Sequence, residues 1–228
     1  SHAHLLTYIF LADETGRALA AALLRAAARG VACRLLVDAI GSKRFLRSAL
    51  RRELERGGVR VVAALPTRLH LDRARFDLRN HRKIVVLDGA IGYTGSHNLA
   101  AASFALKPEF APWVDATVRI HGPAVRDLQE LFVQDWYMET GETLEECLAL
   151  VPPPHPDGIP VQIIGTGPDS LRYGWLLFQP VGGEVQQAAA AQVLHHGQTL
   201  GFPQGHQFFQ GNLGRKTQDA EVAGMDFQ

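Results

Sequence analysis

The stretch RNHRKIVVLDGAIGYTGSHNLA, residues 79–100, decides the fold of this chain, because it predicts two strands that pair with each other. Residues 81–88 alternate and then run apolar, which is typical of a central strand. Residues 89–96 follow tightly after a glycine and predict the returning arm of a hairpin. Residues 98–106 predict the start of a helix, with Asn98 near its N-terminus.

Strands and helices alternate before this stretch. Apolar runs predict strands at residues 4–12, 31–39 and 59–65, and apolar residues at helical spacing predict helices at residues 13–30 and 42–58. This order indicates a parallel α/β sheet with right-handed crossovers.

The chain after the stretch continues the same pattern and then changes character. Residues 113–120 predict a strand and residues 122–140 a helix, while residues 161–167 could begin another strand. The last 55 residues hold 10 Gln, against 3 in the first 170, and lose their hydrophobic periodicity.

We therefore expect three parts. Residues 1–150 form one domain, and residues 151–173 form a linker with the start of a truncated second half. Residues 174–228 form a disordered or non-native tail, which a shifted reading frame would explain.

Charge is unevenly distributed, although the formal net charge is zero. Residues 40–83 hold 13 Lys/Arg against 4 Asp/Glu, whereas residues 109–146 hold 9 acidic and 2 basic residues. A basic segment beside a site favours anionic substrates such as phosphate esters. For Arg51, Arg52 and Arg56, a solvated helix face is an equally good interpretation.

The number and spacing of cysteines and the hydropathy of the chain exclude several classes of protein. Cys33 and Cys147 form no CxxC and no zinc-like spacing, so neither a disulfide framework nor a metal site is expected. No apolar run reaches the roughly 18 residues that span a bilayer, and no signal peptide precedes the first strand. Because a strand starts almost at Ser1, we expect a fragment of a longer protein.

The side chains of the opening stretch suit a phosphate. His81 and Lys83 are two residues apart on the predicted strand, so both leave the same face. Ser96 and Asn98 follow a glycine at the hairpin exit, where a helix N-terminus would favour an anion. A histidine in such a pocket can attack phosphorus or protonate the leaving oxygen, and Lys83 can neutralise the developing charge without a metal or other cofactor.

The spacing of these residues is specific. His81-x-Lys83, four residues, Asp88, six residues and Gly95-Ser96-x-Asn98 resemble the HKD motif of the phospholipase D superfamily at every fixed position. Longer segments across residues 3–172 resemble the first catalytic half of bacterial cardiolipin synthases: AALLRAAARGVACRLLVDAIGS, RFDLRNHRKIVVLDG, WVDATVRIHGPAVRDLQELFVQDW and VQIIGTGPDS. The resemblance implies a phospholipase D-like mixed sheet flanked by helices in α-β-α layers.

The resemblance also implies roles for the motif residues. His81 would be the nucleophile or the general acid. Lys83 and Asn98 would hold the phosphate oxygens, and Ser96 would support that pocket.

Two aspartates have less direct roles by the same resemblance. Asp88 belongs to the catalytic motif, and we expect it to brace the loop rather than touch substrate. Asp115 falls where superfamily members carry a carboxylate that orients the histidine, although a plain strand-edge aspartate is the alternative. His97 occupies a variable motif position and receives no role.

The chain departs from the family in one respect. Such enzymes carry two HKD motifs that together make one site, and here His195, His196 and His206 all lack a lysine two residues on. Either two copies of the chain pair symmetrically, or the chain is a truncated half that is inactive alone. We favour the truncated half.

The leading hypothesis is a phosphatidyltransferase that moves a phosphatidyl group between phosphatidylglycerols through phosphohistidine. Its partners would be phosphatidylglycerol or another anionic phospholipid, a membrane surface at the cytoplasmic face of the bacterial inner membrane, and a second HKD half or second copy. Nucleic acid is not expected as a partner. The alternatives are a homodimeric phosphodiesterase or nuclease, a phospholipase D hydrolase, and a lipid-binding fragment without turnover.

Overall fold

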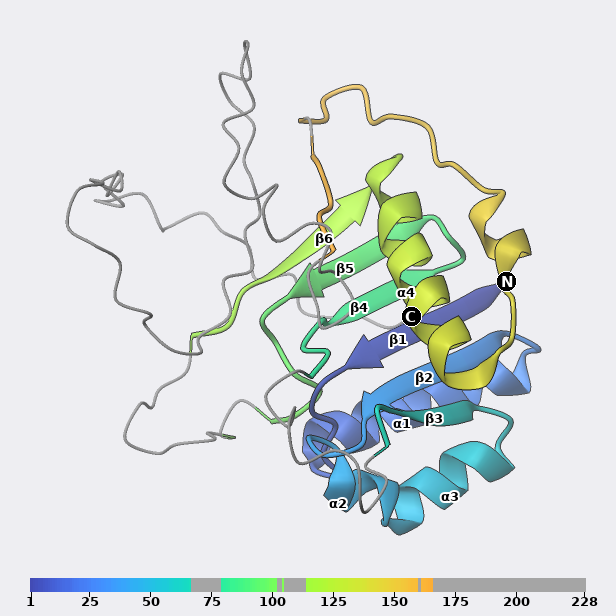
Figure 1. Ribbon diagram of the computed structural model, residues 1–228, viewed down its shortest axis with the longest axis vertical. Helices are drawn as coiled ribbons and strands as arrows, with labels where there is room; N and C mark the ends of the chain where they lie inside the picture. The colour runs from blue at the N-terminus through green and yellow to red at the C-terminus, as the bar shows by residue number, and fades with distance from the viewer. Residues whose placement is uncertain (67–78, 102–103, 105–113, 160, 166–228) are drawn as a thin grey trace, which may run out of the picture. The chain divides into compact units, whose positions relative to one another are not determined.

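A six-stranded mixed sheet forms the centre of the computed structural model, which describes residues 1–66, 79–101, 104, 114–159 and 161–165 (Figure 1). The strand order is β3-β2-β1-β4-β5-β6. The strands are β1 (His2–Thr7), β2 (Ala32–Asp38), β3 (Arg60–Ala64), β4 (Ile84–Leu87), β5 (Ile91–Gly95) and β6 (Thr117–His121).

The direction of the strands changes at β1. β1, β2 and β3 are parallel, as their alternation with helices predicts. β4 pairs antiparallel with the other side of β1, and β5 and β6 continue antiparallel. The predicted hairpin is therefore confirmed, and β4 joins it to β1, which is the last strand of the parallel half.

Helices cover both faces of this sheet. The longer helices are α1 (Glu14–Ala28), α3 (Ala49–Arg56) and α4 (Ala124–Thr140), and the short ones are α2 (Lys43–Leu46) and the 3-10 helix η2 (Glu145–Leu148). α1 and α3 pack on one face and α4 on the other (Figure 1). The α-β-α layers are thus confirmed. No helix in the described part of the chain is long and apolar enough to cross a bilayer.

The two core clusters follow from strand alternation. Leu5 and Leu35 pack against α1 and α3, whereas their neighbours Leu6 and Leu36 pack against α4. All four are buried, which stabilises the fold by roughly 1.5–3 kcal/mol for each side chain. β1 and β2 are hence apolar on both faces, as expected for strands covered by helices on either side.

Four predicted elements have clearly different bounds in the structure. The strand predicted at residues 4–12 is β1 (His2–Thr7), so residues 8–12 lie outside it. The helix predicted at residues 42–58 divides into α2 and α3, because the Ser48 side chain accepts a hydrogen bond from Arg51 N at 3.3 Å and caps a new helix there. The strand predicted from His81 begins only at Ile84, and the strand predicted from residue 113 begins at Thr117.

Two predictions of further elements are wrong for the residues that the structure describes. No helix starts at Asn98, because Leu99 forms an isolated β-bridge with Phe10. In this bridge Leu99 N donates to Ile9 O and Leu11 N donates to Leu99 O, both at 3.0 Å. Residues 161–165 form no strand. The predicted tail, residues 174–228, lies outside the described residues.

A polar network is buried at the start of β1. His4 is fully buried and stacks on Phe132, and its two ring nitrogens lie 2.8 Å from Gln129 Nε2 and 3.2 Å from Arg34 NH1. Burial, together with the charges of His2 and Arg34, lowers the pKa of His4 to about 3. The folded protein therefore holds His4 as a neutral imidazole.

This pKa predicts loss of stability in acid. An unfolded histidine titrates near pH 6.5, so between about pH 6.5 and 3 the unfolded chain takes up a proton at His4 that the folded chain refuses. The free energy of unfolding should be highest above pH 6.5 and fall by up to about 1.4 kcal/mol per pH unit below it from this group. Urea denaturation from pH 7 to pH 4 measures this slope. His4→Gln should flatten it, whereas His97→Gln at an exposed position should not; an equal slope in both variants would contradict the assignment.

Candidate active site

His81 lies at the edge of the sheet where the parallel strands end. It belongs to an irregular segment, residues 79–83, that leads into β4. Its ring stacks on that of Tyr8, the residue after β1, with 4.0 Å between ring centroids and 18° between planes. The imidazole is thereby held flat against a half-buried aromatic ring.

The backbone on either side of His81 is anchored by two ion pairs. Arg79 Nε lies 2.8 Å from the Asp38 carboxylate at the end of β2, and both side chains are buried. Arg82 NH1 lies 2.7 Å from the Asp135 carboxylate on α4, and Asn80 Nδ2 donates to the same carboxylate at 2.8 Å. Successive side chains of an extended chain point to opposite sides. The His81 side chain therefore points away from the side of Asn80 and Arg82 and toward Tyr8.

Lys83 leaves the segment on the same side as His81. Its Nζ donates to the backbone oxygen of His81 at 2.8 Å and lies 6.0 Å from the centroid of the Tyr8 ring. Burial lowers the pKa of Lys83 to about 8, and the negative charge of Asp115 opposes part of this shift. A desolvated ammonium beside His81 interacts strongly with an anion.

Asn98 and Ser96 follow each other closely after β5, but they bond different parts of the chain. Asn98 Oδ1 accepts the backbone N–H of Ile9 at 3.1 Å, which fixes the amide so that its Nδ2 is the donor. Because Ile9 follows Tyr8, Asn98 and His81 lie at the same end of β1. Ser96 instead bonds the chain before β6: its Oγ accepts from Ala116 N at 3.0 Å, and its N donates to Ala116 O at 2.9 Å.

The two aspartates lie in different places. Asp88 stands at the far end of β4, with a left-handed φ of 54°, and is tied to the first residues of β1: its N donates to His2 O at 2.8 Å, and its Oδ1 accepts from His2 N at 2.6 Å. It is thus separated from His81 by the length of the strand. Asp115 is exposed just before β6 and interacts electrostatically with Lys83.

Sequence reasoning missed the residues that support His81. Ser42 is fully buried; its Oγ donates to Tyr8 O at 3.0 Å and accepts from Phe10 N at 2.9 Å. Asp38 accepts from Ile40 N and Gly41 N at 2.8 Å in addition to Arg79. The available signal was their position after strands, because carboxyl ends of parallel strands commonly form sites.

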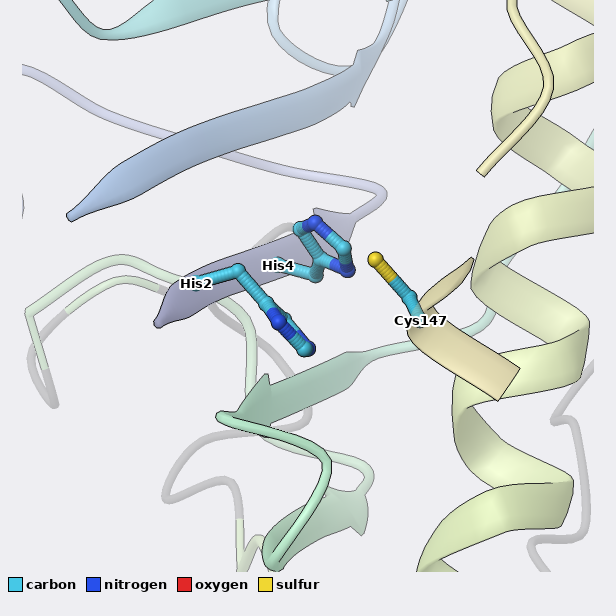
Figure 2. A group of neighbouring side chains, drawn as sticks. All are labelled: His2, His4 and Cys147. Atoms are coloured by element: carbon cyan, nitrogen blue, oxygen red, sulfur yellow. The ribbon is translucent and has the colours of Figure 1, made fainter. Parts of the chain in front are cut away.

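One group of possible metal ligands lies near the opposite edge. His2, His4 and Cys147 offer ligand atoms within 4.8 Å of one another, and the Cys147 sulfur points toward the two rings (Figure 2). The rings of His2 and His4 are stacked, with centroids 4.3 Å apart, so their in-plane lone pairs do not converge on one point. The Arg34 guanidinium beside His4 also opposes a cation. These side chains fit a hydrogen-bonded network better than a metal centre.

The edge at His81 can therefore hold a phosphate ester. An imidazole supplies a nucleophile or an acid, and Lys83 Nζ and Asn98 Nδ2 supply one charged and one neutral donor. The anion-binding helix N-terminus that the sequence predicts at Asn98 is missing from the described residues 98–101.

Comparison with known proteins identifies the family. The family model described as cardiolipin synthase, PLD-like domain, matches residues 1–136. Major cardiolipin synthase ClsA of Bacillus subtilis is 37% identical over 174 residues, which cover 74% of this chain and 35% of the relative. Cardiolipin synthase A of Pseudomonas syringae pv. syringae is 42% identical over 172 residues, 75% of this chain and 35% of the relative.

A solved structure is also similar. It is Nuc from Salmonella typhimurium, a phospholipase D family member, with a TM-score of 0.41 and 17% identity over 60% of this chain and 78% of that chain. The chain spans about a third of the length of the curated relatives it matches. Since the family model covers more than half of its residues, this chain belongs to the family of cardiolipin synthase phospholipase D-like domains.

Proposed function

We propose that this chain is the first catalytic half of a phosphatidyltransferase that makes cardiolipin from two phosphatidylglycerol molecules. The observation that carries the proposal is that His81 and Asn98 are each held against the chain just after β1, with Lys83 bonded to the backbone of His81. Their spacing matches the HKD motif, and relatives at 37–42% identity are named cardiolipin synthases.

The reaction has two steps. A ring nitrogen of His81 attacks the phosphorus of one phosphatidylglycerol; a P–N bond forms, and the P–O bond to the terminal glycerol breaks. The departing oxygen takes a proton from an acid on the second half. A glycerol hydroxyl of another phosphatidylglycerol then gives its proton to that group and attacks phosphorus, which breaks the P–N bond and releases cardiolipin. If water were the acceptor, the product would be phosphatidic acid, as for a hydrolase.

The other site residues assist this reaction. Lys83 and Asn98 stabilise the charge that builds on the phosphate oxygens. Asp115 orients His81 or offsets the charge of Lys83, Ser96 holds the wall formed by the chain before β6, and Asp88 braces the far end of β4.

The partners follow from the substrate. The enzyme meets phosphatidylglycerol at a membrane surface, at the cytoplasmic face of the inner membrane, and completes its site with a second HKD half or a second copy of the chain. Nucleic acid is not a partner in this proposal, and salt-sensitive retention on DNA with turnover of a DNA substrate would favour the nuclease alternative instead.

Reconstitution tests the function. The purified chain is incubated with phosphatidylglycerol vesicles, alone and mixed with the separately produced remainder of the Bacillus subtilis relative, and cardiolipin is measured by mass spectrometry. We expect product only in the mixture and none with His81→Ala, because the histidine supplies the P–N bond.

The relative's own two parts, mixed in the same way, form the control. An active control beside an inactive mixture would contradict the proposal. Cardiolipin from the chain alone that depends on His81 would mean that two copies complete the site.

The pKa of Lys83 predicts a pH effect on substrate binding. The ammonium is protonated below about pH 8 and neutral above it, while a phosphodiester keeps its charge throughout. The Kd for soluble dihexanoyl-phosphatidylglycerol should therefore rise about tenfold from pH 7 to pH 9 in calorimetry. Lys83→Arg stays protonated and should give a flat profile, even if its affinity is lower. A flat profile for the unmodified chain would show that Lys83 does not bind the phosphate in its charged form.

Tyr8 should act as a positioning residue for His81. In the reconstituted mixture, Tyr8→Phe keeps the stacked ring and should retain kcat within about twofold, whereas Tyr8→Leu releases the imidazole and should lower kcat by about 10- to 100-fold with little change in KM. Equal kcat values for the two variants would remove this role.

A further inference from the structure

We propose that the exposed basic residues of α2 form the surface on which this chain docks to an anionic bilayer, with the His81 edge turned toward the lipid. This inference rests on the proposed function, because it takes the substrate to be an anionic phospholipid. It adds which face of the domain meets the membrane.

The charge of this surface is concentrated. Residues 39–52 hold five Lys/Arg and no Asp or Glu. Of these, Lys43, Arg44, Arg47 and Arg52 are exposed, and none of the four forms an ion pair within the part of the chain that the structure describes. Lys43 and Arg44 lie on α2 and Arg47 is its C-cap residue, whereas Arg52 lies on α3. Arg51, by contrast, is paired with Glu55 at 2.9 Å. We call Lys43, Arg44 and Arg47 the α2 basic patch.

The patch adjoins the site. Lys43 follows Ser42, whose hydroxyl bonds the backbone of Tyr8, and Tyr8 stacks on His81. Gly41 packs so closely on Tyr8 that a Cβ there would lie 2.4 Å from Tyr8 O. In Figure 1, α2 lies by the end of β2, on the side toward which the arrowheads of the parallel strands point. A bilayer resting on the patch would thus lie beside the phosphate pocket.

The patch binds by charge rather than by insertion. The apolar residues of these short helices, Phe45, Leu50 and Leu54, are buried in the core and are not available to lipid. Each lysine or arginine beside an anionic bilayer is attracted to its headgroups, and this attraction is screened by salt. The docking is therefore expected to depend steeply on ionic strength.

The chain offers a matched control surface. Arg25, Arg29 and Arg56 are also exposed, but they lie at the ends of α1 and α3, where the chain enters β2 and β3. That is the opposite edge of the sheet from His81. Reversing either set changes the net charge by the same amount.

The experiment is co-sedimentation of the full chain with vesicles of phosphatidylglycerol and phosphatidylcholine, and with phosphatidylcholine alone, at 50 and 500 mM salt. We expect binding to anionic vesicles at low salt only. The variant K43E/R44E/R47E should bind about 100-fold more weakly, and R25E/R29E/R56E no more than about threefold more weakly. If circular dichroism shows that the charge reversal disturbs α2, the neutral variant K43Q/R44Q/R47Q replaces it in the same assay.

The outcomes separate this inference from the proposed function. Three results would contradict the proposal that the α2 basic patch docks to the bilayer. They are an equal loss of vesicle binding in the two reversal variants, vesicle binding that survives 500 mM salt, and tighter binding to duplex DNA than to the vesicles. The assay needs no turnover, so a positive result stands even where reconstitution yields no cardiolipin. Conversely, K43E/R44E/R47E should still act on soluble dihexanoyl-phosphatidylglycerol in the reconstituted mixture, because the patch contains no residue of the pocket.

Discussion

The geometry of the site depends on two ion pairs that hold residues 79–83 from opposite sides. This segment precedes β4 and pairs with no strand among the described residues, so no ladder of backbone hydrogen bonds is seen to fix it. Arg79 reaches Asp38 on one side, and Arg82 reaches Asp135 on the other. Buried pairs of this kind add little net stability, but losing one partner costs about 3–5 kcal/mol. Their effect here is to give His81 one orientation, against Tyr8.

Hydrophobic patterning was sufficient to predict most of the fold. Alternating apolar strands and helices located β1, α1, β2, β3 and α4, and the glycine after Asp88 located the hairpin, because these signals are local. The breaks at Ser48 and before Ile84 were not predictable in the same way. Each depends on a competing interaction: a serine that caps a new helix in one case, and side chains held by tertiary ion pairs in the other.

The site residues also fall into two groups: those that a local sequence pattern predicts and those that only tertiary structure brings together. Motif spacing predicts His81, Lys83 and Asn98 as site residues, since a fixed spacing is visible in the sequence alone. Tyr8 and Ser42 were not found, because their link to the site joins residues 34 and more positions apart and appears only when the strands are assembled. The motif itself also divides in space, as Asp88 closes β1 against β4 at the other end of the strand.

The pairing of β1 with two neighbours also sets an order for folding during synthesis. β1 pairs with β2 about 30 residues later, whereas its bond to β4 joins His2 and Asp88, 86 residues apart. At about 5–20 residues per second, the second edge of β1 waits roughly 4–17 s for its partner to leave the ribosome. An open edge of an apolar strand is a template for aggregation. The same closing step covers that edge and brings His81 onto Tyr8, so the nascent chain becomes protected and places its histidine at one moment.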